Sequence, residues 1–215
     1  MASGTNAIWV IGTRVLTGGY SIERYQPITK QWQIVSSVGA VRLSVTPSGD
    51  PAVISESGKT YMKKNSKWVR IKGCASDLAF GHNGQIFKLG CTRNRAGFRI
   101  YSYVGKERGW RRMLVGGGTS LAVDAAGDPW IINAHKTVFK WDSLAEKWRS
   151  MGLRGQAHEI AAGPAGHVYV LAGELVDGGG YRIHRWAGDK VWYPIPGKGA
   201  MHISIGMGGK PYIVD

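Results

Sequence analysis

Short runs of alternating apolar and polar residues, separated by glycine-rich turns, fill the chain. "FRIYSY" (Phe98–Tyr103) and "YRIHRW" (Tyr181–Trp186) place an apolar side chain at almost every second position. Such alternation, bounded by Gly, Asp, Asn and Pro, is typical of half-buried β-strands. No stretch of about 11 residues or more shows the periodicity of a helix. The pattern therefore predicts an all-β chain of short strands.

The runs recur in one order, in units of about 40 residues, and we label them a to d. Run a is small and apolar, run b is β-branched, run c alternates, and run d opens on a tryptophan. These marker tryptophans, separated by 36, 42, 38 and 44 residues, are Trp32, Trp68, Trp110, Trp148 and Trp192. The turn prolines Pro51, Pro129 and Pro211 step by 78 and 82 residues, as every second tryptophan does. Both markers indicate a double repeat of about 80 residues, made of two unlike units.

Four-stranded units that repeat at this spacing are the signature of a β-propeller. The small residues of run a fit the crowded centre of the ring, and the larger residues of runs b to d fit its periphery. We therefore predict an all-β propeller of four-stranded blades, built from three double repeats. The alternative, a β-sandwich, would require two independent markers to agree by chance.

The pattern leaves two ways to close the ring, because it contains five a, six b, five c and five d runs. We prefer six blade units, in a single domain that spans residues 1–215. Five-bladed closure, in which C-terminal strands complete the N-terminal unit, is the alternative. An incomplete ring would expose strand edges and invite strand-edge pairing with another chain. The expected units are 1–37, 38–73, 74–117, 118–155, 156–199 and 200–215.

The segment "SLAVDAAGDPWIINAHKTVFKWDSLAEKW" (Ser120–Trp148) shows all four runs of one unit. It resembles the tectonin repeat of tectonins and tachylectin-type lectins. The resemblance implies a binding propeller: some members are lectins for bacterial or modified sugars, and others engage membranes or protein partners. Only Trp130 with Asn133 matches the family's Trp-and-Asn pattern well, whereas Trp9 lacks the Asn and Ala52 replaces the aromatic residue. The ligand therefore stays open.

Charge points to an acidic partner. The chain has 28 Lys and Arg against 14 Asp and Glu, a net charge of +14, and such a field favours anionic glycans, phospholipids, acidic proteins or nucleic acid. Of these, nucleic acid is the partner that the sequence does not favour, since it contains no recognised nucleic-acid-binding module. No apolar run approaches the roughly 18 residues of a transmembrane segment. With no secretory leader in the sequence, we expect a cytoplasmic protein, or one secreted after removal of a leader.

Two groups of side chains are candidates for binding. Aromatic residues that vary between units could stack on sugar rings, with polar neighbours bonding the hydroxyls; this set is Trp9, Trp130, Asn133, Trp141, Asp142 and Trp186. Arginines of the third unit could contact an anionic partner; this set is Arg93, Arg95, Arg99, Arg108, Arg111 and Arg112. For the first set the competing interpretation is ordinary packing, and for the second a solvated surface. The long b-to-c loops of alternate units should rise on one face of the ring, where loops commonly bind ligands.

The remaining candidates for chemistry are weaker. Cys74 and Cys91 flank runs a and b of one unit, so a hairpin would set them opposite each other. The two cysteines could form a disulfide, or they could both be reduced, as a cytosolic location would favour. None of the six histidines has metal-ligand spacing. We therefore expect no catalytic residues, no metal and no cofactor.

These observations support two hypotheses. The first is a non-enzymatic, lectin-like propeller with several sites between blades, which prefers anionic or modified glycans. The second is a scaffold propeller that docks through its basic surface and an open strand edge onto an acidic protein assembly or an anionic membrane. The charge of +14 favours the second, and the family resemblance favours the first.

Overall fold

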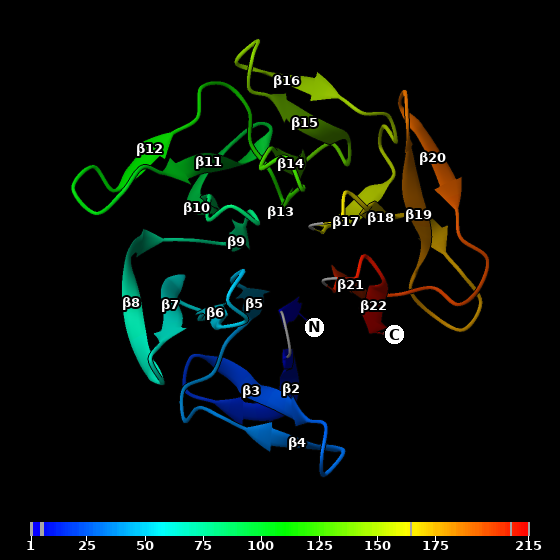
Figure 1. The fold of residues 1–215 in the computed structure, drawn as a ribbon. Coiled ribbons are helices and arrows are strands. Elements are labelled where there is room, and N and C mark those ends of the chain that lie inside the picture. The colour runs from blue at the N-terminus through cyan, green and yellow to red at the C-terminus, as the bar shows by residue number, and fades with distance from the viewer. Residues whose placement is uncertain (1, 5–6, 164, 207, 215) are drawn as a thin grey trace.

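The computed structural model describes residues 2–4, 7–163, 165–206 and 208–214, which form 22 strands and no helix. Five antiparallel sheets of four consecutive strands surround a common centre as the blades of a propeller (Figure 1). Two further strands form a sheet of their own beside blade 5. The prediction of an all-β propeller with four-stranded blades is confirmed, and the complete blades number five.

The strands have the following bounds. Blade 1 consists of β1 (Ala2–Gly4), β2 (Ala7–Leu16), β3 (Gly19–Gln26) and β4 (Gln31–Ile34). Blade 2 consists of β5 (Arg42–Val45), β6 (Pro51–Ile54), β7 (Lys59–Lys64) and β8 (Lys67–Cys74). Blade 3 consists of β9 (Asp77–Phe80), β10 (Ile86–Asn94), β11 (Gly97–Tyr103) and β12 (Trp110–Arg112).

Blade 4 consists of β13 (Ser120–Val123), β14 (Pro129–Ile132), β15 (Val138–Asp142) and β16 (Lys147–Ser150). Blade 5 consists of β17 (Ala157–Ala162), β18 (Val168–Leu175), β19 (Tyr181–Gly188) and β20 (Val191–Pro194). The two-stranded sheet consists of β21 (His202–Ile205) and β22 (Pro211–Val214).

The preference for six blade units is not confirmed, because the sixth unit contributes only β21 and β22. These strands do not complete the N-terminal unit either, since β1 pairs with β2 and gives blade 1 an inner strand of its own. β21 contacts both β17 and β1. The two-stranded sheet therefore lies between blade 5 and blade 1 (Figure 1).

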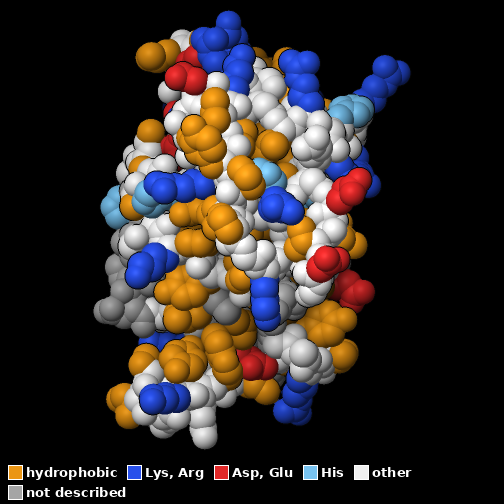
Figure 2. All heavy atoms as spheres, turned by 90° about the vertical axis from the view of Figure 1, so that its right-hand side faces the viewer, with side chains coloured by type: hydrophobic (Ala, Val, Ile, Leu, Met, Phe, Trp, Pro, Cys, Tyr) orange, Lys and Arg blue, Asp and Glu red, His pale blue; other side chains and the backbone are white. Residues whose placement is uncertain are grey.

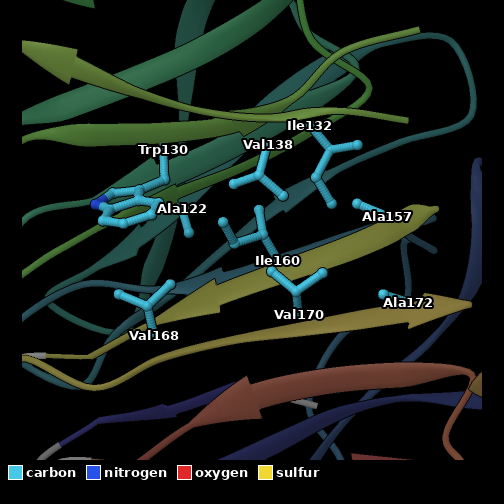
Figure 3. Close-up of a cluster of buried hydrophobic side chains, with 9 residues drawn as sticks. All are labelled: Ala122, Trp130, Ile132, Val138, Ala157, Ile160, Val168, Val170 and Ala172. Carbon is cyan, nitrogen blue, oxygen red and sulfur yellow. The ribbon is translucent and has the colours of Figure 1, made fainter. Parts of the chain in front are cut away.

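The core lies between blades rather than within one sheet. In the largest cluster, Trp130, Ile132 and Val138 of blade 4 meet Ile160 and Val170 of blade 5 (Figure 3). Equivalent clusters join blade 1 to blade 2, blade 2 to blade 3, blade 3 to blade 4, and blade 5 to the two-stranded sheet. Each sheet buries side chains on both faces, which is why β14 reads as a continuous apolar run.

The marker tryptophans of the outer strands take part in these clusters. Trp68, Trp110, Trp148 and Trp192 each pack against the interblade core on one side of their own blade. Trp32 of blade 1 is different, since 42% of its side chain is exposed. It pairs with Tyr25, on the face of blade 1 opposite the one that packs against blade 2.

The motif Gly-Gly-Tyr, or its variant Ala-Gly-Phe, opens the third strand of blades 1, 3 and 5 because the chain crosses another backbone there. Tyr20 bridges to Ala40 and Phe98 to Gly118, each in the connection that follows its own blade. A Cβ atom at Gly19 would lie 2.6 Å from the backbone of Ala40, and one at Gly97 would lie 2.7 Å from Gly118. Glycine is therefore required, and the equal geometry confirms that the long hairpins recur at alternate blades.

A disulfide joins Cys74, the last residue of β8, to Cys91 in β10, with a Cα–Cα distance of 5.6 Å. Of the two alternatives that the sequence left open, the structure shows the disulfide. The β9–β10 hairpin, in which Asp77 pairs with Leu89, sets the two cysteines nearly opposite each other as expected, and because Cys74 also ends β8 the bond connects blade 2 to blade 3. Gly58 leaves space for it, because a Cβ there would lie 2.5 Å from the Cys74 Sγ. The short link between β8 and β9 brings the two strands together at this point.

Candidate functional site

The two tryptophans that the sequence suggested on second strands are buried in the ring. Trp9 is 4% exposed, and its Nε1 donates to the Gly49 carbonyl of blade 2. Trp130 is 2% exposed, and its Nε1 donates to the carboxylate of Asp124 at 2.8 Å. Both rings therefore hold turns of the propeller in place.

The other members of this set also make local contacts. Asn133 is 9% exposed, and its Oδ1 accepts the backbone N–H groups of His135 and Thr137 in a turn. Asp142 accepts two backbone N–H groups at the opposite end of β15 and pairs with Arg149. These polar groups shape the turns at either end of the strand.

Of the six, the structure brings two aromatic rings together. The rings of Trp130 and Trp186 meet edge to face at 5.4 Å, with Trp192 beside them. Trp141 instead contacts Trp148 of its own blade, and Trp9 lies in blade 1. The set does not form one site, and a role of its members in ligand binding stays a prediction.

A central channel of about 710 Å³ runs along the innermost strands. The charged residues and histidines on its lining lie near the starts of these strands, and apolar residues such as Phe80, Val123 and Ile205 lie at their ends. The polar mouth is formed by Arg42, Asp77, Thr119, His158, Glu159 and His202.

Asp77 joins neighbouring inner strands at this mouth. Its carboxylate accepts the N–H of Leu78 and the N–H of Leu121 in the neighbouring inner strand β13, both at 2.9 Å. Burial raises the pKa of Asp77 from 3.8 to about 7, against the opposing effect of the nearby Arg42 charge. The side chain is therefore a structural acceptor whose charge is costly at neutral pH.

Two histidines complete the mouth. His202 Nδ1 lies 3.3 Å from the Glu159 carboxylate. His158 stacks on Tyr181 at 3.5 Å, and its burial, helped by the charge of Lys136, lowers its pKa below the usual value. Among the described residues, no three His, Cys, Asp or Glu side chains are placed to hold a metal ion. Nor does the described part of the chain contain a helix that could cross a membrane.

The arginines lie on blade 3, and the structure separates them into parts. Arg93 and Arg95 are at the tip of the β10–β11 hairpin, and Arg108 is in the turn at the other end of the blade. Arg111 and Arg112 are exposed on the outer strand β12, whereas Arg99 is half-buried in β11. Because they lie at both ends of the blade and on its outer strand, they do not form one compact patch by themselves.

Blade 2 extends this basic surface. Its outer strand β8 exposes Lys67, Arg70 and Lys72. The backbone of Lys72 lies directly beside blade 3, because its carbonyl accepts the indole N–H of Trp110 at 3.0 Å. We call the combined surface the basic face; it comprises Lys67, Arg70, Lys72, Arg93, Arg95, Arg108, Arg111 and Arg112.

The imbalance of charge on these two blades is large. Residues 59–112 hold 14 of the chain's 28 lysines and arginines but only two of its 14 aspartates and glutamates. One of the two acids is Asp77, which lines the channel. The ion pairs among the described residues lie in blades 4 and 5 and β21, so the cations of 59–112 have no ion pair within that part of the chain. The basic face is therefore not neutralised within the molecule.

Lys88 is a cation that sequence reasoning missed. It is 6% exposed between blades 2 and 3, and its Nζ lies 4.3 Å from the ring centre of Trp110 and 5.6 Å from that of Tyr101. Burial lowers its pKa. A lysine inside the apolar run "IFKLG" was the signal for a buried cation. Both aromatic partners belong to blade 3, and the amino group lies beside Gly73 of blade 2, where an added Cβ would be 2.5 Å from Nζ.

Comparison with solved structures finds propellers. The chain is similar to the tricorn protease, with a TM-score of 0.53 and 12% identity over 89% of this chain and 22% of that one. It is also similar to YCF48 bound to a D1 peptide, with a TM-score of 0.55 and 13% identity over 90% of this chain and 65% of that one. The chain thus spans less than two thirds of each, and such likeness shows the fold alone. YCF48 from Cyanidioschyzon merolae matches at a TM-score of 0.48 and 10% identity, over 73% of this chain and 55% of that one.

Comparisons of sequence add no family. No family model matches the chain, and no curated protein matches it. The similar solved structures support the propeller fold that the resemblance to tectonins implied. Membership of the tectonin and tachylectin family is not confirmed.

Proposed function

We propose that the protein is a non-catalytic scaffold whose basic face docks an acidic protein. The observation that carries the proposal is the unneutralised charge of residues 59–112, which contain 14 cations and two acids. Exposed arginines are suited to bind carboxylates through paired hydrogen bonds. An anionic partner would also be steered toward this side of the ring by the field of the whole molecule.

A protein partner fits the shape of the basic face better than a membrane does. Its cations extend from the tip of the β10–β11 hairpin, over the outer strands, to the turn at the other end of blade 3. A flat bilayer would meet only part of this curved side, whereas an acidic chain could follow it. Among the structural neighbours, YCF48 is bound to a peptide, which supports a protein partner for this architecture.

The state of the two cysteines bears on where the protein is located in this proposal. Cys74 and Cys91 are both exposed and bonded to each other. Such bonds persist in oxidising compartments and are rare in the cytosol. We therefore favour the secreted alternative over a cytoplasmic location.

Glycan binding remains a second proposal, with a different candidate surface from the one that the sequence suggested. Among the described tryptophans, Trp32 is the exposed one, at 42%, and its ring lies 5.2 Å from that of Tyr25. Such a pair offers an aromatic face for a sugar. A glycan array that compares the protein with its Trp32→Ala variant tests this role.

Binding of labelled poly-L-glutamate, measured by fluorescence anisotropy, tests the main proposal. In the basic-face variant, Lys67, Arg70, Arg111 and Arg112 are replaced by Glu. The control variant reverses four exposed cations elsewhere: Lys136, Lys147, Arg154 and Lys190. Both variants change the net charge equally.

We expect the basic-face variant to weaken binding at least about tenfold, as loss of several charge-assisted contacts predicts. The control variant should change binding far less. Equal weakening in both variants would show that only net charge attracts the polymer, and would refute docking at the basic face. Tighter binding to phosphatidylserine vesicles than to polyglutamate would favour a membrane partner instead.

A further inference from the structure

The innermost strands form a closed wall around the central channel. β1, β5, β9, β13, β17 and β21 follow one another around the centre, and each contacts the next, with β21 contacting β1 (Figure 1). Figure 2 shows the outside of the ring from the side of blade 5, where acids are scattered among basic and apolar side chains. Because six strands surround the channel, strands that are three places apart lie on opposite sides of it.

One polar side chain from each of five inner strands lies at the polar mouth. In order around the ring these are Arg42, Asp77, Ser120, Glu159 and His202. Each comes directly before a branched apolar residue of run a, so they hold equivalent places in the repeat. Asp77 accepts the N–H of Leu121 in the next inner strand. Ser120 does the same, since its Oγ accepts the N–H of Ile160 at 3.2 Å. These two side chains therefore connect neighbouring inner strands.

Arg42 and Glu159 have hydrogen-bonding capacity that the fold does not use. The exposed Arg42 guanidinium donates to the carbonyl of its own neighbour Val41 at 3.0 Å, and it forms no ion pair with a described residue. One Glu159 oxygen lies 3.3 Å from the His202 ring, and the other accepts no hydrogen bond from a described residue. The mouth therefore offers one base and one acid to a ligand.

This base and this acid lie on opposite sides of the channel. β5 and β17 are three places apart in the ring of six inner strands, so Arg42 and Glu159 face each other across its centre. Besides burial, which raises the pKa of Asp77, the charge of Arg42 lowers that pKa and the charge of Glu159 raises it. Both side chains therefore lie near the Asp77 carboxylate, but they form no ion pair with each other.

Apolar surface continues from the mouth into the channel. Tyr20, which is 46% exposed, and Tyr181, whose ring stacks on His158, both lie on the lining. Two positions further along the inner strands, the lining residues are small, as in Ala79, Ala122 and Ala161. The channel volume of about 710 Å³ is within the range of small-molecule sites.

A ligand that complements this mouth carries both charges. A simple anion at Arg42 would leave Glu159 without a partner, and a simple cation at Glu159 would leave Arg42 without one. We propose that the mouth binds a free amino acid with an apolar side chain. Arg42 pairs with the carboxylate of the ligand through two parallel hydrogen bonds, and Glu159 accepts from its ammonium group. The side chain of the ligand extends past the two tyrosines into the channel. This site is separate from the basic face and does not rest on the proposed function.

L-Phenylalanine is the probe, and isothermal titration calorimetry at neutral pH measures its binding. Two analogues each lack one charge: hydrocinnamate lacks the amine, and phenethylamine lacks the carboxylate. The mouth variants are Arg42→Gln and Glu159→Gln. Their matched controls are Arg108→Gln and Glu107→Gln, which remove the same charges from the exposed turn between β11 and β12.

The original protein should bind phenylalanine at least about tenfold more tightly than either analogue, because each analogue loses a charge-assisted contact. Arg42→Gln should abolish the preference for phenylalanine over phenethylamine, and Glu159→Gln should abolish the preference over hydrocinnamate. The two controls and the basic-face variant should bind phenylalanine as the original protein does, which separates failure of this site from failure of the proposed function.

Absence of binding at millimolar phenylalanine overturns the proposal. Hydrocinnamate that binds as tightly as phenylalanine also overturns it, in favour of a site for simple anions, and so does unchanged binding in both mouth variants. The comparison of analogues uses the original protein, so it decides the matter even where a variant does not fold.

Discussion

The marker tryptophans offer a matched pair for a stability test, because Trp192 and Trp32 hold the same place in the repeat but have different surroundings. Trp192 is half-buried, donates its indole N–H to the Met151 carbonyl at 2.7 Å, and meets the rings of Trp130 and Trp186. Trp32 is 42% exposed, and its ring contact is with Tyr25. Their replacement by alanine should therefore have unequal costs.

The expected magnitudes follow from these contacts. Removal of a core tryptophan costs about 3–5 kcal/mol, and the hydrogen bond to Met151 adds about 1 kcal/mol. Since Trp192 is only half-buried, we expect its Ala variant to lose about 3–4 kcal/mol in total. For Trp32→Ala, a partly exposed surface position, we expect a loss of about 1 kcal/mol.

Urea unfolding followed by far-ultraviolet circular dichroism measures both variants without relying on tryptophan fluorescence. The slope of the unfolding free energy with urea should stay unchanged, so the midpoints compare directly. Equal losses for the two variants would refute the reasoning, because they would mean that Trp32 has a packing neighbour as Trp192 does.

Three further predictions concern other positions. Because burial raises the pKa of Asp77 from 3.8 to about 7, the unfolded chain loses this proton first, and stability should fall as pH rises from about 4 to about 7. Asp77→Asn should flatten that fall in urea titrations between pH 5 and 8, and an unchanged slope would contradict the role of Asp77. Asp124→Ala should lower the free energy of unfolding by about 3 kcal/mol, since three hydrogen-bond donors and Lys140 lose their acceptor. A loss below about 1 kcal/mol would argue against this structural role of Asp124. The double variant Cys74→Ser with Cys91→Ser removes a disulfide between cysteines that are 17 positions apart, and should lower the free energy of unfolding by about 3 kcal/mol. Dithiothreitol should reproduce this loss in the original protein and have no effect on the variant.

The fold could be read from the sequence because each blade repeats the same physical requirement. The turn prolines, the marker tryptophans and the Gly19 and Gly97 positions recur wherever strands cross or pack in the same way. β1 escaped notice because Ala2–Gly4 contains no large apolar residue and so no alternation. That omission left the first unit without an inner strand in the sequence interpretation and distorted the count of blades.

The sites were harder to predict, because a sequence pattern does not show which neighbour a strand meets. Trp9 and Trp130 vary between units in the way that a ligand-binding residue would, yet both indoles bond to turns, in the next blade or their own. The hairpin that brings Cys74 to Cys91 was visible in the sequence, but that Cys74 also ends the outer strand of the preceding blade, so that the bond links two blades, was not. The arginine cluster was visible, but its joining with β8 of blade 2 depends on packing of the ring.

Hydrogen–deuterium exchange with bound polyglutamate tests the central claim, docking of an acidic chain on the basic face, most directly. The outer strands β8 and β12 have backbone groups at the periphery of blades 2 and 3, where exchange is sensitive to a covering partner. The account predicts slower exchange in residues 67–74 and 110–112, with blades 4 and 5 unchanged. Protection confined to blades 4 and 5, or spread evenly over the ring, would contradict it.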